Sequence, residues 1–208
     1  MQIEQGDRKM NEIKLQIKGR EQDTFAIHYS CECFHNGGAV APAVCTISIV
    51  NYKSKELHTF ALHNYMIQGK SLLESEQQLL KDFIEFYKSL NNPLFIHWAM
   101  DSLEYGFKAI YARAENYGLY DFDLSQIEDF NLSEVIDSGL IKSLEENNCK
   151  RVTVLGGKDE AICFNKRAFD MVKMSTEGKV LGIMDLFEKY LSNDLVNNYD
   201  DERMIEYD

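Results

Sequence analysis

The chain contains few of the residues that mark linkers, disulfide frameworks or membrane spans. Among 208 residues there are only 2 prolines, so we do not expect a modular protein rich in linkers. The 5 cysteines are an odd number at irregular spacing, which does not suggest a secreted disulfide framework. No apolar run approaches the ~18–20 residues that span a bilayer, and the N-terminal residues lack the apolar core of a signal peptide. We therefore expect a cytoplasmic protein that has reduced thiols and does not enter a membrane.

Basic residues are also scarce. The 22 Lys and Arg against 34 Asp and Glu give a net charge of −12, which excludes a broadly basic protein held to phosphates by counterion release. Most of the excess lies in two segments: residues 121–137 hold six acidic and no basic residues, and residues 199–208 hold five acidic residues and one Arg. The rest of the chain carries only −2 and is close to neutral. Net charge therefore leaves a nucleic-acid partner open.

The chain does have enough apolar material for a core, since 45% of its residues are hydrophobic and 12 are Phe and 11 Tyr. At this length we expect one domain. We divide the sequence into an N-terminal arm or short helix (1–22), a single α/β domain (23–192) and an acidic C-terminal tail (193–208).

The hydrophobic pattern predicts three strands, a helix, a strand and a helix, in that order. The predicted strands are 24–29, 44–52, 56–63 and 94–98, and the predicted helices run from Ser71 or Ser75 to about residue 90 and from Asp101 or Ser102 to about residue 117. This order indicates a mixed central sheet flanked by helices in three layers. Farther along we expect short helices at 132–140 and 139–147, an extended link at 152–155, one or two helices over 158–174 and a final amphipathic helix at 178–191.

The first candidate site lies in the segment IHYSCECFH, residues 27–35. Strand alternation places His28, Ser30 and Glu32 on one face. A carboxylate such as Glu32 at the end of a central strand is well placed to hold Mg²⁺ or Mn²⁺, which prefer carboxylate oxygens. Alternatively, Glu32 only ends the strand and faces water. A zinc site built from His28, Cys31, Cys33 and His35 is disfavoured, because alternation splits these residues between two faces.

Two further carboxylates are candidates for the same chemistry. Asp101 follows the buried strand 94–98, and open α/β sheets bind ligands at the ends of such strands. The alternative role for Asp101 is a helix N-cap. Asp185, within VLGIMDLFEKYL, points either into a cleft or to solvent. The Gly156–Gly157–Lys158 turn lacks the spacing of a Walker motif and is interpreted as the entry to a helix.

The order of elements, Glu32 after the first strand and the H-x-x-x-D pattern at residues 97–101 together resemble the DEDD-type 3′–5′ exonucleases of the ribonuclease H-like fold. The resemblance covers roughly residues 24–120, with a weaker continuation to about residue 191. In that family an Asp-x-Glu pair ends the first strand, a strand-to-helix junction supplies a second Asp, and a final helix supplies a third. The resemblance implies that these four carboxylates hold two metal ions, Mg²⁺ or Mn²⁺, which hydrolyse a phosphodiester.

The sequence departs from this pattern at the first Asp, where Ser30 stands. Glu32, Asp101 and Asp185 are the counterparts of the other three carboxylates, and they are the predicted catalytic and metal-binding residues. The family's general base, a His or Tyr before the last Asp, has no clear equivalent, since the nearest polar residues are Ser175, Thr176 and Glu177.

Three functions remain open from the sequence. The first is a metal-dependent, exonuclease-like protein whose activity is weakened or lost, acting on single-stranded nucleic acid. The second is a non-catalytic member of the fold that serves as a binding or assembly subunit, through self-association or within a larger nucleic-acid or defence complex. The third, more distant function is the binding of a small molecule or nucleotide in the same cleft.

Overall fold

A computed structural model of the chain describes residues 2–32, 41–102, 105–123, 127–136 and 154–193. Short 3-10 helices lie at Glu21–Asp23 and Leu132–Glu134. The longer elements follow one another as α1 (Gln2–Ile17), β1 (Thr24–Cys31), β2 (Val44–Asn51), β3 (Leu57–Ala61), α2 (Leu62–Met66), α3 (Leu72–Ser89), β4 (Leu94–His97), α4 (Phe107–Glu115), β5 (Glu128–Asn131), α6 (Gly157–Asn165) and α7 (Phe169–Ser192).

The five strands form one mixed sheet in the order β3-β2-β1-β4-β5. β2 pairs antiparallel with β1 and with β3, whereas β4 pairs parallel with β1 and with β5. The carboxyl ends of β1, β4 and β5 therefore lie along one edge of the sheet, which we call the carboxyl edge. The predicted α/β class and mixed sheet are confirmed.

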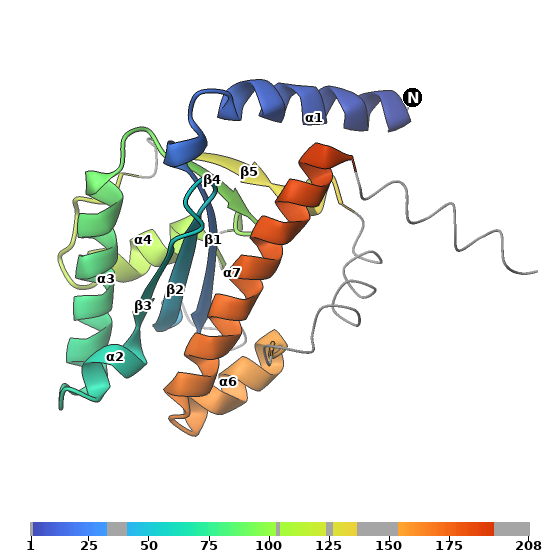
Figure 1. Ribbon diagram of the computed structural model, residues 1–208. Helices are drawn as coiled ribbons and strands as arrows, with labels where there is room; N and C mark the ends of the chain where they lie inside the picture. Colours follow the sequence, from blue (N-terminus) through green and yellow to red (C-terminus); the bar gives the residue numbers. More distant parts are fainter. Residues whose placement is uncertain (1, 33–40, 103–104, 124–126, 137–153, 194–208) are drawn as a thin grey trace, which may run out of the picture.

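Helices cover both faces of the sheet. Successive side chains along β1 point to opposite sides, and apolar side chains on both sides need to be buried. Phe25, Ile27 and Tyr29 join the core beneath α3 and α4, whereas Ala26 belongs to a second core formed with α1 and α7. Figure 1 shows α7 crossing the sheet in front, with α3 and α4 on the other side. The result is a three-layer arrangement.

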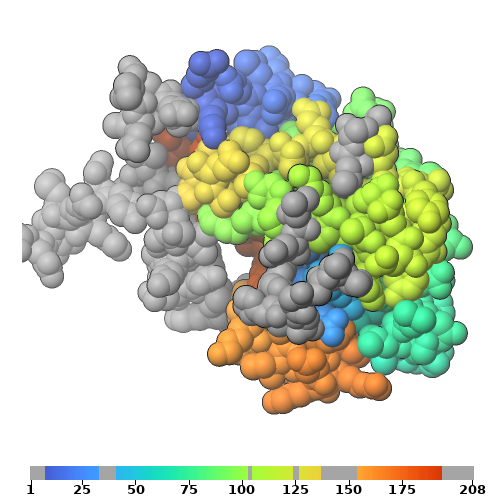
Figure 2. All heavy atoms as spheres, turned by 180° about the vertical axis from the view of Figure 1, so that it is seen from behind, coloured from blue at the N-terminus to red at the C-terminus, as the bar shows by residue number. Residues whose placement is uncertain are grey.

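The two ends of the sheet are also covered. α1, which occupies most of the predicted arm, is a helix whose Ile13 and Ile17 are buried in the same core as α7. α6 contacts β1 and α7. Figure 2 shows α1 in blue and α6 in orange at opposite ends of the molecule.

A buried carboxylate joins three elements on the α3 side of the sheet. Glu76 of α3 accepts hydrogen bonds from Arg113 at 2.6 Å through both of its oxygens, from the Tyr117 hydroxyl at 2.6 Å and from the Val44 N–H at 2.7 Å. These donors compensate the lost hydration of a side chain that is only 3% exposed. Loss of hydration and the bond to Glu76 raise the pKa of Tyr117 to about 12. The network fixes the start of β2 against α3 and α4.

Most predicted boundaries before residue 100 agree with the structure. The prediction of Ser71 as the start of a helix is confirmed, since Ser71 and Glu74 form a capping box at the N-terminus of α3. The second predicted helix begins later than expected, at Phe107 rather than after Asp101 or Ser102. β5 was not predicted, because its four residues (EDFN) are exposed or half-buried and carry no apolar alternation.

The C-terminal helices begin and end at residues other than those predicted. The segment predicted as one or two helices over 158–174 breaks at residues 166–168, where Arg167 adopts a left-handed conformation with φ of 58°. The final helix begins at Phe169, nine residues before the predicted start, and continues through Gly178. Packing of its inner side chains on the sheet outweighs the low helix propensity of glycine. The predicted helix at 139–147 lies outside the described residues.

Gly106 lies in the connection between β4 and α4, at a position where no side chain fits. Its φ is 125°, and a Cβ atom added there would lie 1.6 Å from the carbonyl oxygen of Met100. Because both the backbone conformation and the contact exclude a side chain, we predict that Gly106→Ala lowers the free energy of unfolding by at least about 2 kcal/mol. Urea unfolding followed by circular dichroism measures this change.

Gly182→Ala is the matched control, because a Cβ atom at Gly182 meets nothing within 4 Å. In the interior of α7 this change should raise the free energy of unfolding by up to about 1 kcal/mol. Equal effects of the two substitutions would contradict the tight packing assigned to Gly106.

Candidate functional site

The sequence predicts a metal site at the carboxyl end of β1, and the structure places two hydroxyl groups there. The Oγ atom of Ser30 on β1 lies 2.7 Å from Oγ1 of Thr176 on α7, and both residues are buried. Thr176 donates its own proton to the carbonyl oxygen of Val172 at 2.8 Å. Ser30 must therefore be the donor to Thr176, so that the two hydroxyls satisfy each other and leave no charge at this point.

A largely buried ion pair joins α7 to α6. Nζ of Lys179 on α7 is 2.8 Å from Oε1 of Glu160 on α6, and their side chains are only 19% and 6% exposed. The Ser175 hydroxyl donates to Glu160 at 2.7 Å and accepts from the N–H of Leu155 at 2.9 Å. Glu160 thus has two partners on α7, which hold α6 against α7.

His28 lies two residues before Ser30 on the same face of β1 and is partly buried. The Tyr105 hydroxyl is 3.4 Å from its ring nitrogens and donates to the carbonyl oxygen of Tyr29 at 2.9 Å. Loss of hydration, with the charge of Lys179 as a second cause, lowers the pKa of His28 to about 3 from its ordinary value of 6.5. His28 is therefore neutral at physiological pH.

Asp185 lies far from the hydroxyl pair along α7. Nine residues separate it from Thr176, which corresponds to about 13 Å of helix rise. The neighbouring Phe187 contacts Tyr52, and the N–H of Tyr52 bonds to the carbonyl oxygen of Thr24 at the amino end of β1. Asp185 instead forms a 2.8 Å ion pair with Lys189 and is 48% exposed. The residue of α7 that faces Ser30 is Thr176.

Glu32 and Asp101 share the carboxyl edge, because they follow the parallel strands β1 and β4. Glu32 is partly buried, and its N–H bonds to the carbonyl oxygen of Ala43 at 2.9 Å. Asp101 is exposed and accepts from the Asn131 side chain at 3.1 Å. It does not cap a helix, since α4 has Gly106 as its N-cap.

The turn before Asp101 is held by residues of β4 and β5 that the sequence did not single out for this role. Nδ1 of the buried His97 accepts from the Met100 N–H at 3.1 Å, so its Nε2 carries the proton and donates to Asp129 at 2.9 Å. Asn131 accepts from the Ala99 N–H at 3.0 Å while it donates to Asp101. Asp129 and Asn131 could not be recognised because β5 itself was not predicted.

The side chains at this edge do not fit the two-metal site that the resemblance implies. In the described ranges, no three His, Cys, Asp or Glu side chains lie close enough together to hold a metal ion. At the level of Ser30 the ligand atoms are neutral hydroxyls, which bind Mg²⁺ and Mn²⁺ more weakly than carboxylates do. Two of the four residues of the disfavoured zinc site, Cys33 and His35, lie outside the described residues. Gly156, interpreted as part of a helix-entry turn, is the N-cap of α6.

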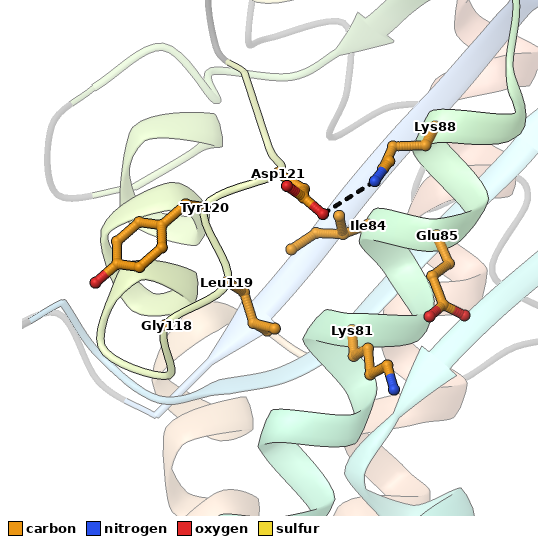
Figure 3. A pocket seen from close by; sticks show the side chains of 8 residues that line it. All are labelled: Lys81, Ile84, Glu85, Lys88, Gly118, Leu119, Tyr120 and Asp121. Atoms are coloured by element: carbon orange, nitrogen blue, oxygen red, sulfur yellow. Dashed lines mark hydrogen bonds and ion pairs between the residues drawn. The ribbon is translucent and has the colours of Figure 1, made fainter.

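A surface pocket of about 230 Å³ lies away from the carboxyl edge, between α3 and the turn after α4. Figure 3 shows its lining, in which Lys88 of α3 forms a 3.0 Å ion pair with Asp121. The other lining residues are Lys81, Ile84, Glu85, Gly118, Leu119 and Tyr120. The pocket is lined by two basic and two acidic side chains and has no net charge, so it favours neither anionic nor cationic ligands.

A scan of this chain against protein-family models and a search of curated proteins both find no match. Among the described residues, no helix has both the length and the apolar character needed to cross a membrane.

We predict that His28 makes the fold sensitive to acid. Below about pH 6.5 the unfolded chain binds a proton at His28 that the folded chain does not bind until about pH 3. Stability should therefore fall as pH drops through this range, by at most about 1.4 kcal/mol per pH unit. The free energy of unfolding is measured with urea at pH 7 and at pH 5. Between these two pH values it should fall by up to about 2 kcal/mol less in His28→Gln than in the wild type.

His63→Gln is the control, because it removes a histidine of α2 outside this cluster. The control should keep the wild-type difference between the two pH values. Identical acid sensitivity in His28→Gln and the wild type would show that His28 does not titrate as its surroundings indicate.

Proposed function

We propose that this protein is a non-catalytic member of the DEDD exonuclease-like group and acts as a binding or assembly subunit. The observation that carries the proposal is the 2.7 Å hydrogen bond between Ser30 and Thr176. In a two-metal nuclease the corresponding strand and final helix would each present a carboxylate to the metal ions. Here the strand and the helix present two neutral hydroxyls that bond to each other.

The strand arrangement supports the fold assignment on which this proposal depends. Three consecutive antiparallel strands followed by two parallel ones, in the order β3-β2-β1-β4-β5, fit the expected ribonuclease H-like sheet. Helices on both faces, with the last one packed against β1, fit the same architecture. The fold alone does not decide the activity, which depends on the residues at the carboxyl edge.

The ion pair of Lys179 and Glu160 further supports loss of the reaction. Burial lowers the pKa of His28 on β1, and the positive charge of Lys179 is the second cause, so Lys179 lies close enough to act on His28. Glu160 of α6 is buried and already has Lys179 and Ser175 as partners, so its carboxylate is not free to bind a metal ion.

A weakened nuclease is the competing function, and the position of Glu32 and Asp101 on the same edge favours it. An assay of nucleic-acid degradation distinguishes the two functions. The purified protein is incubated with end-labelled single-stranded DNA and RNA in the presence of Mn²⁺, beside Glu32→Gln and Asp101→Asn. We predict no degradation by the wild type above the level of either variant. Degradation by the wild type that either substitution abolishes would establish the nuclease instead.

Restoring the carboxylates should restore metal binding if the hydroxyl pair occupies the former metal site. We predict that the double substitution Ser30→Asp with Thr176→Asp makes the melting temperature rise on addition of Mn²⁺, because Glu32 then has two carboxylate neighbours. A Mn²⁺ concentration one hundred times the Kd would stabilise the fold by about 2.7 kcal/mol. Differential scanning fluorimetry with and without Mn²⁺ measures the effect.

The double substitution Ser30→Asn with Thr176→Asn is the matched control, since it has the same size but adds no charge. The control and the wild type should show no rise with Mn²⁺. If the Asp variant, once shown to be folded, does not respond to Mn²⁺ either, the hydroxyl pair does not mark a former metal site.

A further inference from the structure

The methionines of this chain differ widely in their exposure to solvent. The structure describes those from residue 10 to residue 184. Met100 and Met184 are 0% and 3% exposed, and two others are partly buried against the cores. Met171 and Met174 of α7 are 44% and 54% exposed. Among the described methionines, these two are therefore the most accessible to molecules in solution.

Met171 and Met174 lie on the same side of α7, because residues three apart are neighbours on the surface of a helix. Of the two residues between them, Val172 is buried and Lys173 donates to the side chain of Asn64 on α2 at 3.2 Å. This part of α7 therefore buries one side and presents both methionines on the other. We call Met171 and Met174 the methionine pair.

We propose that the methionine pair is a site of reversible oxidation by peroxides. In this reaction the thioether sulfur attacks one oxygen of hydrogen peroxide with its lone pair. A sulfur–oxygen bond forms, the oxygen–oxygen bond breaks, and the departing hydroxide takes the remaining proton and leaves as water. The sulfur is oxidised by two electrons and the peroxide is reduced. The product, methionine sulfoxide, is polar where the thioether was apolar.

Exposure selects the methionine pair over the other described methionines. A thioether carries no proton that must be lost before it reacts, so contact with the oxidant decides its rate. Met100 and Met184 are enclosed by the side chains of the two cores and meet peroxide only when the fold opens. Met171 and Met174 need no such opening, since both are exposed in the folded chain. The fold itself therefore sets the order in which these methionines are oxidised.

The position of the methionine pair also makes its oxidation compatible with the fold and open to reversal. The oxygen atoms added at Met171 and Met174 stay hydrated, whereas a sulfoxide at Met184 would be buried among apolar side chains. An exposed sulfoxide is accessible to the methionine sulfoxide reductases, of which there is one type for each sulfoxide epimer. This inference does not depend on the proposed function, because it involves neither the hydroxyl pair nor a metal ion.

The test incubates the full chain with hydrogen peroxide and follows each methionine by mass spectrometry of tryptic peptides. Trypsin cuts after Lys173, so that Met171 and Met174 are measured in separate peptides. Both should be oxidised at least about tenfold faster than Met100 and Met184 in the folded chain. In urea the four rates should agree within about twofold, because the unfolded chain encloses none of them. Methionine sulfoxide reductases A and B, added together with dithiothreitol, should return both peptides to their original mass.

Substitution by glutamine, which is polar and similar in length, imitates the sulfoxide. The double substitution Met171→Gln with Met174→Gln should shift the melting temperature by no more than about 2 °C, because both positions are exposed. Met184→Gln is the matched control in the buried side of α7 and should lower it by at least about 4 °C. Equal oxidation rates at all four methionines of the folded chain would overturn the inference, as would equal shifts in the two glutamine variants or sulfoxides that the reductases do not remove.

Discussion

The hydroxyl groups of Ser30 and Thr176 meet where α7 crosses the end of β1, and their hydrogen bond fixes the chemistry of the carboxyl edge. Both groups are buried, and their loss of hydration is compensated because Ser30 donates to Thr176 and Thr176 donates to the carbonyl oxygen of Val172. The same contact sets which residues of α7 face the strand. It places Lys179 in the cluster that contains His28, allows Glu160 to bond to α7, and directs Asp185 toward the opposite end of β1.

The polar cluster at this edge is an arrangement of fully used groups. Ser175 connects Leu155 to Glu160, Lys179 neutralises Glu160, and neutral His28 lies beside the Tyr105 hydroxyl. Networks of this kind define one conformation well but leave few lone pairs for a ligand. The inner side of α7 packs against the sheet, and Met171, Met174 and Leu181 on its outer side are exposed.

The sequence was informative wherever apolar periodicity was strong. β1, β2, β4 and α3 were predicted from alternation, from a short apolar run and from three- and four-residue spacing, and the Ser71 cap followed from its distance to Glu74. β5 was missed because EDFN at the edge of the sheet is half-exposed and too short to show a period. The start of α4 was misplaced because the conformation of Gly106 depends on its contact with Met100, which no local pattern reveals.

The candidate site was harder to predict than the fold, because it depends on which turn of α7 faces β1. Asp185 was the best carboxylate in the final helix by type, but the helix begins nine residues earlier than predicted, and Thr176 occupies the level of Ser30. The most direct test is a crystal structure of the wild type grown in millimolar Mn²⁺, with anomalous scattering recorded to locate the metal. We predict no anomalous peak among Ser30, Glu32, Asp101 and Thr176. Two peaks about 3.5–4 Å apart at that edge would contradict the loss of the metal site.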